Sequence, residues 1–185
     1  DYLHLLDMTF AQAIASTEIK LGDAIRISDR ADGLFDVVLD SSVTPNGKDA
    51  IQCVSPLALK WRPTIPVDPV ALGAVKNGIA DNLDILRYAL DTYANVESFG
   101  GIYGVSDTLQ VLGHQRLWGK TENVRPNSPT DAALTFKWIG GIENRKAVIL
   151  VGVNDVGVDP VTAASGCIVG NFAIECDNKA GFGLY

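Results

Sequence analysis

The chain of 185 residues is long enough for one medium-sized domain, or for a small domain followed by part of a larger one. Its hydrophobic fraction of 47% and charged fraction of 20% are ordinary for a packed globular protein, and no run of about 18 apolar residues predicts a membrane span. The net charge of -7 repels phosphate backbones, which argues against nucleic-acid binding.

The first part of the chain, residues 1–63, predicts a small α+β domain. Residues 7–17 carry apolar side chains at helical spacing, with Asp7 as the expected N-cap. Four short strands are then expected, within residues 21–29, 33–40, 50–54 and 57–63. This pattern predicts a helix followed by a small antiparallel sheet.

A proline-rich segment, residues 64–72, follows this domain. Pro63, Pro66 and Pro69 fall within seven residues, and such spacing stops regular strand pairing and stiffens the chain. We expect a linker here and a second domain over residues 73–185.

The stretch "GAVKNGIADNLDILRYAL" begins this second domain. Gly73 and Gly78 have the spacing of a phosphate-binding loop, but Ile79 and Ala80 follow where that loop needs lysine and a hydroxyl residue. Nucleotide binding is therefore not expected.

An amphipathic helix is expected over about residues 81–94 of this stretch. Asp81 with Asp84 three residues later resembles a capping box, and acidic residues in a first turn favour the helix dipole. One apolar face is formed by Leu83, Leu86, Leu90 and Tyr93. The helix must therefore cover a hydrophobic surface.

Short apolar runs separated by Gly, Asn, Asp and Pro follow the helix. They occupy residues 100–105, 108–113, 133–140, 147–154 and 167–176. Because no helix of about ten residues separates them, a doubly wound α/β fold is disfavoured. A sandwich, a barrel and a parallel β-helix remain, and the last would need a helix to cover its open end.

Two blocks of residues carry a family resemblance. The first is formed by Gly73, Ala74, Gly78, Asp81, Asn82, Leu86, Ala89 and Leu90, and the second by Gly100, Gly101 and Tyr103. Together they resemble the opening of pectate-lyase-like right-handed β-helix domains. Lys76 and Asn77 depart from the Gly-Asp of that pattern, and Asn82 replaces the second residue of its Asp pair.

The preceding segment, residues 11–63, resembles the small domain just ahead of the β-helix in bacteriophage tailspikes. The combined resemblance implies a mainly β chain, with a small α+β N-terminal domain followed by a capping helix and the first rungs of a right-handed parallel β-helix. It also implies that the chain is the front part of a longer protein, reaching about three rungs.

The function that this resemblance implies is that of a phage tailspike located in the virion. The implied partners are two further copies of the chain in a homotrimer, other phage tail or baseplate proteins bound through the N-terminal region, and host surface polysaccharide. Depolymerase activity is expected of the full-length protein, and no cofactor is implied. A non-catalytic trimeric adhesin and a cellular β-helix polysaccharide lyase or hydrolase remain as alternatives.

Glu175 and Asp177 are the candidate catalytic residues within the chain. Residues i and i+2 of a strand point to the same side about 6–7 Å apart, and two carboxylates at such a distance suit glycoside hydrolysis. A solvated strand end would give the same pattern. Glu143, Arg145 and Lys146 are expected to form only a charged turn, and Asp155 and Asp159 only turn residues.

Other site classes have less support in the sequence. The three cysteines, Cys53, Cys167 and Cys176, form no CxxC pair, so neither a disulfide framework nor a metal site is expected. His4 and His114 lack neighbouring His or Cys residues. Aromatic residues that could stack on sugar rings, or else fill the core, are Trp61, Trp118, Trp138, Tyr103 and Tyr185.

Overall fold

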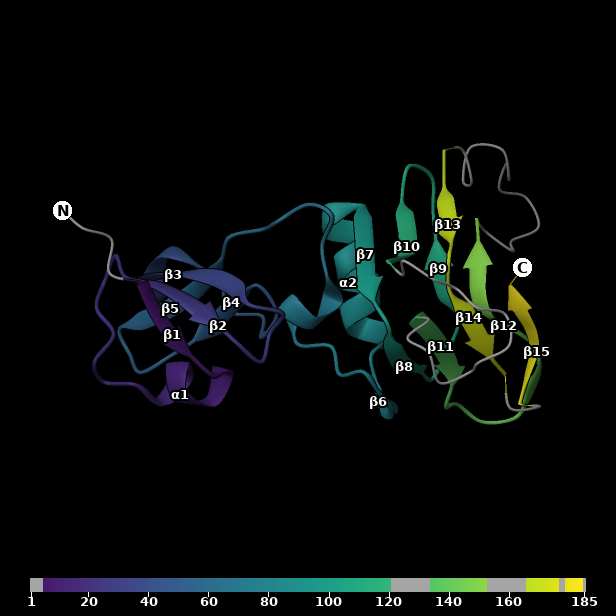
Figure 1. Cartoon of the computed structure of the whole chain (residues 1–185), viewed down its shortest axis with the longest axis horizontal. Helices are drawn as coiled ribbons and strands as arrows, with labels where there is room; N and C mark the ends of the chain where they lie inside the picture. Colours follow the sequence, from purple (N-terminus) through teal and green to yellow (C-terminus); the bar gives the residue numbers. More distant parts are fainter. Residues whose placement is uncertain (1–4, 121–133, 153–165, 177–178, 185) are drawn as a thin grey trace. The chain divides into compact units, whose positions relative to one another are not determined.

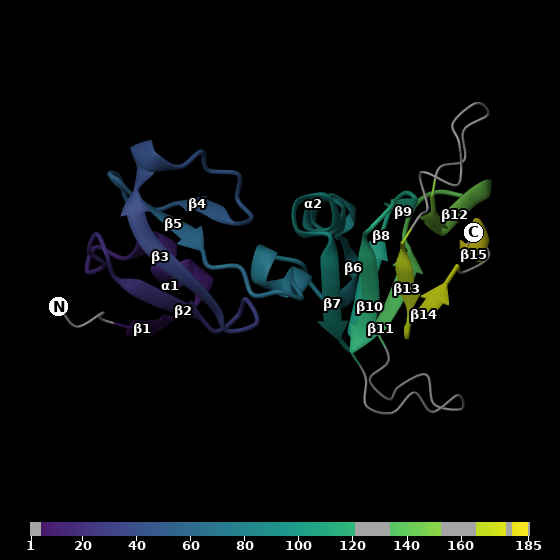
Figure 2. The ribbon, with the colours of Figure 1, turned by 90° about the horizontal axis from the view of Figure 1, so that it is seen from above.

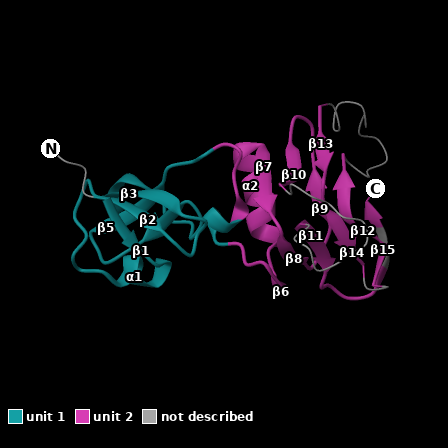
Figure 3. Cartoon of the chain, viewed as in Figure 1, with its two compact units in different colours: residues 1–64, 70–73 teal, residues 65–69, 74–185 magenta. Residues whose placement is uncertain are grey.

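The computed structural model describes residues 5–120, 134–152, 166–176 and 179–184 (Figure 1). The chain divides into two compact units (Figure 3). Unit 1 contains residues 1–64 and 70–73, and unit 2 contains residues 65–69 and 74–185.

Unit 1 is a five-stranded sheet with one short helix. The strands are β1 (Leu5–Met8), β2 (Ala24–Ile27), β3 (Gly33–Leu39), β4 (Ala50–Gln52) and β5 (Leu57–Trp61), in the spatial order β1-β2-β3-β5-β4. Short 3-10 turns lie at Asp40–Ser42 (η1) and Pro69–Leu72 (η2). The four later strands pair antiparallel, as their sequence patterns predict.

Strand β1 corrects the expected antiparallel sheet, because it pairs parallel to β2. Parallel neighbours need a crossover connection, and helix α1 (Phe10–Ala15) supplies it between the two strands. The sequence pattern predicts a helix from Asp7 onward, which overlaps β1, and this strand was therefore not predicted.

The N-cap of α1 is Thr9, and the prediction of Asp7 is wrong. Thr9 Oγ1 accepts a hydrogen bond from Gln12 N (3.3 Å), and Gln12 Oε1 accepts one from Thr9 N (2.8 Å), which completes a capping box. Asp7 lies in β1, with its carboxylate 3.6 Å from the Arg26 guanidinium. The helix cannot start at Asp7 because the strand occupies that position.

Thr9→Ala is expected to lower the free energy of unfolding by about 1 kcal/mol, because it removes the cap of the helix. Asp7→Ala removes only a surface ion pair, and is expected to cost less than about 0.5 kcal/mol. Urea unfolding of both variants checks this order. A larger loss of stability for Asp7→Ala than for Thr9→Ala would contradict the assignment of Thr9 as the N-cap.

Unit 2 consists of three parallel sheets to which successive turns of the chain each contribute one strand. The first turn, called rung 1, comprises β7 (Asn95–Phe99), β8 (Gly101–Val105) and β9 (Leu109–Val111). Rung 2 comprises β10 (Arg116–Lys120), β11 (Leu134–Trp138) and β12 (Glu143–Val151), and rung 3 comprises β13 (Ile168–Gly170), β14 (Ala173–Glu175) and β15 (Ala180–Leu184). The sheet orders are β13-β10-β7, β14-β11-β8-β6 and β15-β12-β9. Each strand of one rung therefore pairs parallel with the corresponding strand of the next rung (Figure 2). The architecture is mainly β and β-helix-like.

The interior of unit 2 is filled by side chains that stack from rung to rung. Tyr103 lies 6.0 Å from Phe136 between ring centroids, and Phe136 lies 5.1 Å from Phe172. Val105 and Trp138, which are paired in register, are both fully buried. Rungs of this kind are stable because each one buries the apolar side chains of its neighbours.

The first rung is covered on all three of its sheets. Strand β6 (Asn77–Asp81) pairs with β8, Val67 forms a parallel bridge with Val96 of β7, and helix α2 (Leu83–Tyr93) contacts β9. Helix α2 buries Leu83, Leu86, Ala89 and Leu90, which agrees closely with the predicted apolar face. Within the described residues, no helix is long and apolar enough to cross a membrane.

The start of α2 differs from the predicted capping box at Asp81 and Asp84. Asp81 still belongs to β6, and the N-cap position is Asn82. Asp81 Oδ1 instead accepts hydrogen bonds from Leu83 N (3.1 Å) and Ser106 N (3.2 Å). The carboxylate therefore ties the helix start to the end of rung 1.

Candidate functional site

The outer side of the β13-β10-β7 sheet carries aromatic, cationic and acidic side chains close together. Along β7 and β10 the side chains alternate between the core and the outer side, and Val96 and Leu117 point inward. The outward positions Glu97, Phe99, Arg116, Trp118 and Lys120 are called here the aromatic–cation face. The register places Trp118 beside Glu97 and Lys120 beside Phe99.

Glu97 is the electrostatic centre of the aromatic–cation face. Its Oε2 lies 3.3 Å from Arg116 Nη2, and its Oε1 lies 3.7 Å from Lys120 Nζ. Only 12% of the Glu97 side chain is exposed, against 35% for Arg116 and 55% for Lys120. The two cations therefore reach solvent more than the carboxylate between them does.

The two aromatic rings lie close to these cations. Lys120 Nζ is 4.8 Å from the centroid of the Phe99 ring, and Phe99 is 57% exposed. Arg116 Cζ is 5.6 Å from the Trp118 centroid. A Cβ placed on Gly170 would meet Trp118 Cζ3, Cη2 and Cε3 at 2.9 to 3.5 Å, so the benzo ring of Trp118 lies across this glycine of rung 3.

The structure separates the aromatic residues that were predicted as sugar-stacking candidates. Trp61, Trp138 and Tyr103 are buried and belong to the core. Trp118 is half-buried on the outer side of the sheet, and Tyr185 lies outside the described residues. Sequence reasoning singled out Trp118 only by residue type, and it missed the cations beside it.

The predicted catalytic pair is described only in part. Glu175 lies at the end of β14, with its Oε1 2.9 Å from Lys137 Nζ of the neighbouring strand β11. Asp177 lies outside the described residues, so the pair stays a prediction. The described geometry of Glu175 is that of a partly exposed ion pair between two rungs.

Of the other charged residues considered in the sequence analysis, some lie within the described residues and some do not. Glu143 and Lys146 belong to strand β12 and not to the expected charged turn. Lys146 Nζ lies 3.1 Å from Asp107 Oδ1. Burial acts to raise the pKa of Asp107, but the hydrogen bond from Thr108 N and the Lys146 ammonium outweigh it and lower the pKa. Asp155 and Asp159 lie outside the described residues.

A partly buried polar network lies next to Phe99. Ser98 Oγ donates to Asp68 Oδ1 (3.1 Å) and lies 2.9 Å from Tyr103 Oη, which is 3.4 Å from the same Asp68 oxygen. Lys76 Nζ completes the network, since it donates to Phe99 O (2.8 Å) and lies 3.6 Å from Asp68 Oδ2. Tyr103 is fully buried, which indicates a structural role rather than contact with a ligand.

Burial, followed by the nearby Asp68 carboxylate, raises the pKa of Tyr103 far above the ordinary value for tyrosine. In the unfolded chain this phenol ionises near pH 10, so above that pH the unfolded state binds fewer protons and stability falls. Tyr103→Phe is expected to cost about 1 kcal/mol at pH 7, because two hydrogen bonds are lost. Above about pH 10 the wild-type chain should lose about 1.4 kcal/mol per pH unit more than the variant does. Urea unfolding at pH 9, 10 and 11 measures this, and parallel losses in the two proteins would contradict it.

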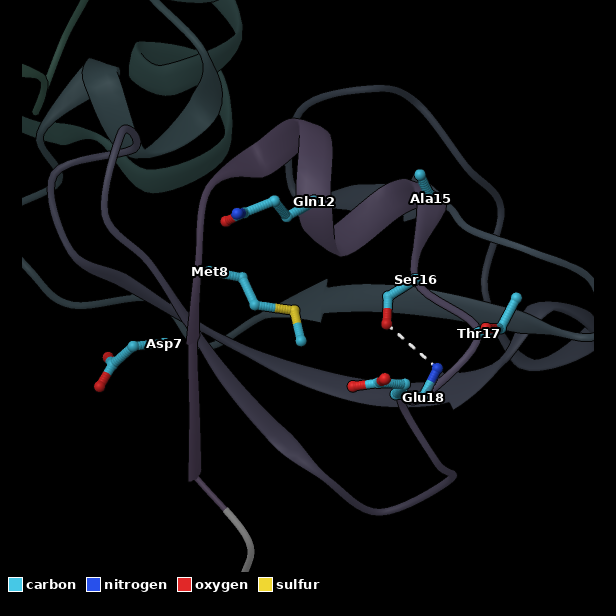
Figure 4. Close-up of a pocket in the computed structure, with 7 residues that line it drawn as sticks. All are labelled: Asp7, Met8, Gln12, Ala15, Ser16, Thr17 and Glu18. Carbon is cyan, nitrogen blue, oxygen red and sulfur yellow. Dashed lines mark hydrogen bonds between the residues drawn. The ribbon is translucent and has the colours of Figure 1, made fainter.

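Unit 1 contains an open groove of about 420 Å³ between α1 and the segment that follows it (Figure 4). Its lining residues are Asp7, Met8, Gln12, Ala15, Ser16, Thr17 and Glu18. Gln12 is engaged in the capping box, and Ser16 Oγ accepts a hydrogen bond from Glu18 N (3.1 Å). Its two carboxylates give the groove an acidic lining. In the described part of the chain, no three His, Cys, Asp or Glu side chains gather in an arrangement that would hold a metal ion.

Comparison with known proteins gives a structural similarity without a detectable sequence relationship. No protein-family model matches the chain, and no curated protein sequence matches it. Among solved structures, the tailspike protein gp49 from Acinetobacter baumannii bacteriophage Fri1, a capsular polysaccharide depolymerase, superposes with a TM-score of 0.60. The two chains are 13% identical, and the match covers 97% of this chain and 35% of the Fri1 protein. The chain has a tailspike-like fold.

Two further solved structures are less similar to this tailspike-like chain. ORF18 of Geobacillus virus E2 matches with a TM-score of 0.45 and 14% identity, over 99% of this chain and 36% of its own length. Tailspike protein 2 from Escherichia coli O157:H7 bacteriophage CAB120 matches with a TM-score of 0.44 and 14% identity, over 90% and 28%. The chain thus spans about a third of the length of these three structures.

Proposed function

We propose that the chain is part of a bacteriophage tailspike whose unit 2 begins a right-handed parallel β-helix of the pectate-lyase-like kind and binds host surface polysaccharide. The observation that carries the proposal is the similarity to the Fri1 tailspike, which extends over 97% of the chain and so includes both units. The Fri1 protein is described as a capsular polysaccharide depolymerase. The parallel three-sheet architecture and the exposed aromatic–cation face support a role in glycan binding.

Residues 1–63, followed by the linker 64–72, form in this proposal the domain that joins the spike to other tail or baseplate proteins of the virion. The acidic groove of unit 1 gives that domain a surface on which a partner could dock. The spike itself is a homotrimer. Exposed apolar side chains on and beside β6 and β8, among them Val75, Ile79 and Ile102, support contacts between copies of the chain.

Depolymerase activity belongs to the full-length protein in this proposal, with Glu175 and Asp177 as the candidate carboxylates within this chain. A non-catalytic trimeric adhesin is the second candidate. It is favoured for this stretch by the Glu175–Lys137 pair, because the carboxylate of Glu175 already has a structural partner on the neighbouring rung. A cellular β-helix lyase or hydrolase is the third candidate.

Incubation of the full-length protein with purified host capsule or lipopolysaccharide tests the proposal. New reducing ends indicate hydrolysis, and absorbance of unsaturated sugars indicates β-elimination. Saturable binding without either product leaves the adhesin, whereas the lack of both binding and cleavage contradicts a glycan-directed spike. Light scattering tests the trimer, and a stable monomer of the full-length protein would refute it.

A further inference from the structure

We propose that the aromatic–cation face binds a carboxylate-bearing sugar unit, such as a uronic or sialic acid, with Trp118 as the stacking platform and with Arg116 and Lys120 as the groups that attract the carboxylate. This inference rests on the proposed function, because it assigns a subsite and a sugar class to the glycan-binding unit. Three observations on the described residues carry it.

The first observation is an excess of positive charge on this face of an acidic chain. Elsewhere, the ion pairs Arg62–Asp36, Lys137–Glu175 and Lys146–Asp107 each join one cation to one carboxylate. Glu97 instead pairs with two cations, both of which are more exposed than it is. The face therefore carries a local positive charge, although the chain as a whole carries -7.

The second observation is the position of the Trp118 ring. The indole lies across Gly170, where any larger residue would displace it, so one side of the ring is supported by the backbone of rung 3. Arg116 Cζ is 5.6 Å from its centroid, whereas Arg30 Cζ, in a close stack in unit 1, is 3.8 Å from the Phe10 centroid. Arg116 thus lies over the ring of Trp118, at a longer distance than in that close stack. A flat apolar surface of this kind suits the apolar side of a pyranose ring.

The third observation is that both parts of the face lie within reach of a single sugar residue. Trp118 shares strand β10 with Arg116 and Lys120, each two residues away and on the same side of the sheet. Same-side neighbours on a strand are about 6–7 Å apart, which is comparable to the span of one pyranose with its carboxylate. Phe99, beside Lys120, extends the apolar surface toward a second sugar unit.

A neutral sugar and an acidic peptide are the competing occupants, and the experiment distinguishes them. The chain is titrated with a panel of oligosaccharides that contain uronic or sialic acid, with their carboxyl-reduced neutral counterparts, and with a poly-glutamate peptide. The readout is the NMR signal of the three indole N–H groups. Trp61 and Trp138 are buried, so the signal of Trp118 reports on this face.

The expected result is a shift of the Trp118 signal with at least one acidic oligosaccharide, and at least about tenfold weaker binding of its reduced counterpart. Trp118→Ala and Lys120→Gln should each weaken this binding at least about tenfold. Trp118→Phe keeps an aromatic ring and should weaken it less than Trp118→Ala does. Lys146→Ala removes one cation from β12, in another sheet, and is the control that should bind as the wild type does. Thermal unfolding shows whether each variant is folded.

Three outcomes would overturn the inference. The first is equal affinity for acidic and reduced oligosaccharides, the second is a shift with the peptide alone, and the third is no response to any member of the panel. If the chain binds host polysaccharide and Trp118→Ala leaves that binding unchanged, the subsite is wrong while the proposed function stands.

Discussion

Replacing Gly119 with alanine is expected to lower the free energy of unfolding by about 3 kcal/mol. Gly119 points inward from β10, against the backbone of Asn171 in rung 3. A Cβ at this position would overlap Asn171 O and would lie 2.9 Å from Asn171 C and 3.3 Å from Leu134 Cβ. Since two of these atoms belong to the backbone, rung 3 must shift, and the hydrogen bond from Asn171 Nδ2 to Gly119 O is lost.

Thermal unfolding followed by circular dichroism measures this effect, and a decrease in Tm of about 10 °C is expected for a chain of this size. Gly141→Ala is the matched control, because a Cβ at Gly141 meets no atom within 4 Å. Equal melting temperatures for the two variants would show that rungs 2 and 3 are not in contact through Gly119.

Asn82→Asp is expected to cost about 3 kcal/mol or more, although it changes a single side-chain group. Asn82 is buried, and its amide Nδ2 donates to Val75 O (3.0 Å) and Ala80 O (2.9 Å), with Gly104 O at 3.5 Å. A carboxylate at this position cannot donate, and it would bury a negative charge against three carbonyl oxygens.

Asn77→Asp provides the control for this prediction, since it makes the same chemical change five residues earlier. The Oδ1 atom of Asn77 accepts hydrogen bonds from Ile79 N (2.9 Å) and Ala80 N (2.8 Å), a role that a carboxylate keeps. Asn77 is also exposed, so the cost is expected to stay within about 0.5 kcal/mol. Urea unfolding of both variants gives the comparison, and equal costs would contradict the donor role of Asn82.

Much of the strand content was predictable because it follows simple patterns. In unit 1, β2 to β5 lie within the four predicted segments, and in unit 2 the apolar face of α2 matches its buried residues. What failed were the boundaries that depend on contacts between distant residues. The sequence pattern favours Asp7 and Asp81 as helix N-caps, but in the structure these residues belong to strands β1 and β6.

Two of the strands that sequence reasoning missed in unit 2, β7 and β10, carry the aromatic–cation face. In β7 and β10 only every second side chain points inward, and Ser98 and Gly119 occupy inward positions. A search for continuous apolar runs therefore passes over "NVESF" and "RLWGK". The alternation of R-L-W-G-K was the available signal, but the neighbour relation of Trp118 to Glu97 arises only from the pairing of two rungs.

The cover over rung 1 bears on the order in which the protein forms during its synthesis. Val67, β6 and α2 all precede or adjoin rung 1 in sequence, and they meet β7, β8 and β9 respectively. A ribosome releases this cover before the later rungs, so each new turn of chain finds a completed surface to pair with as it emerges. The covered strand edges of rung 1 are at the same time withheld from pairing with other nascent chains.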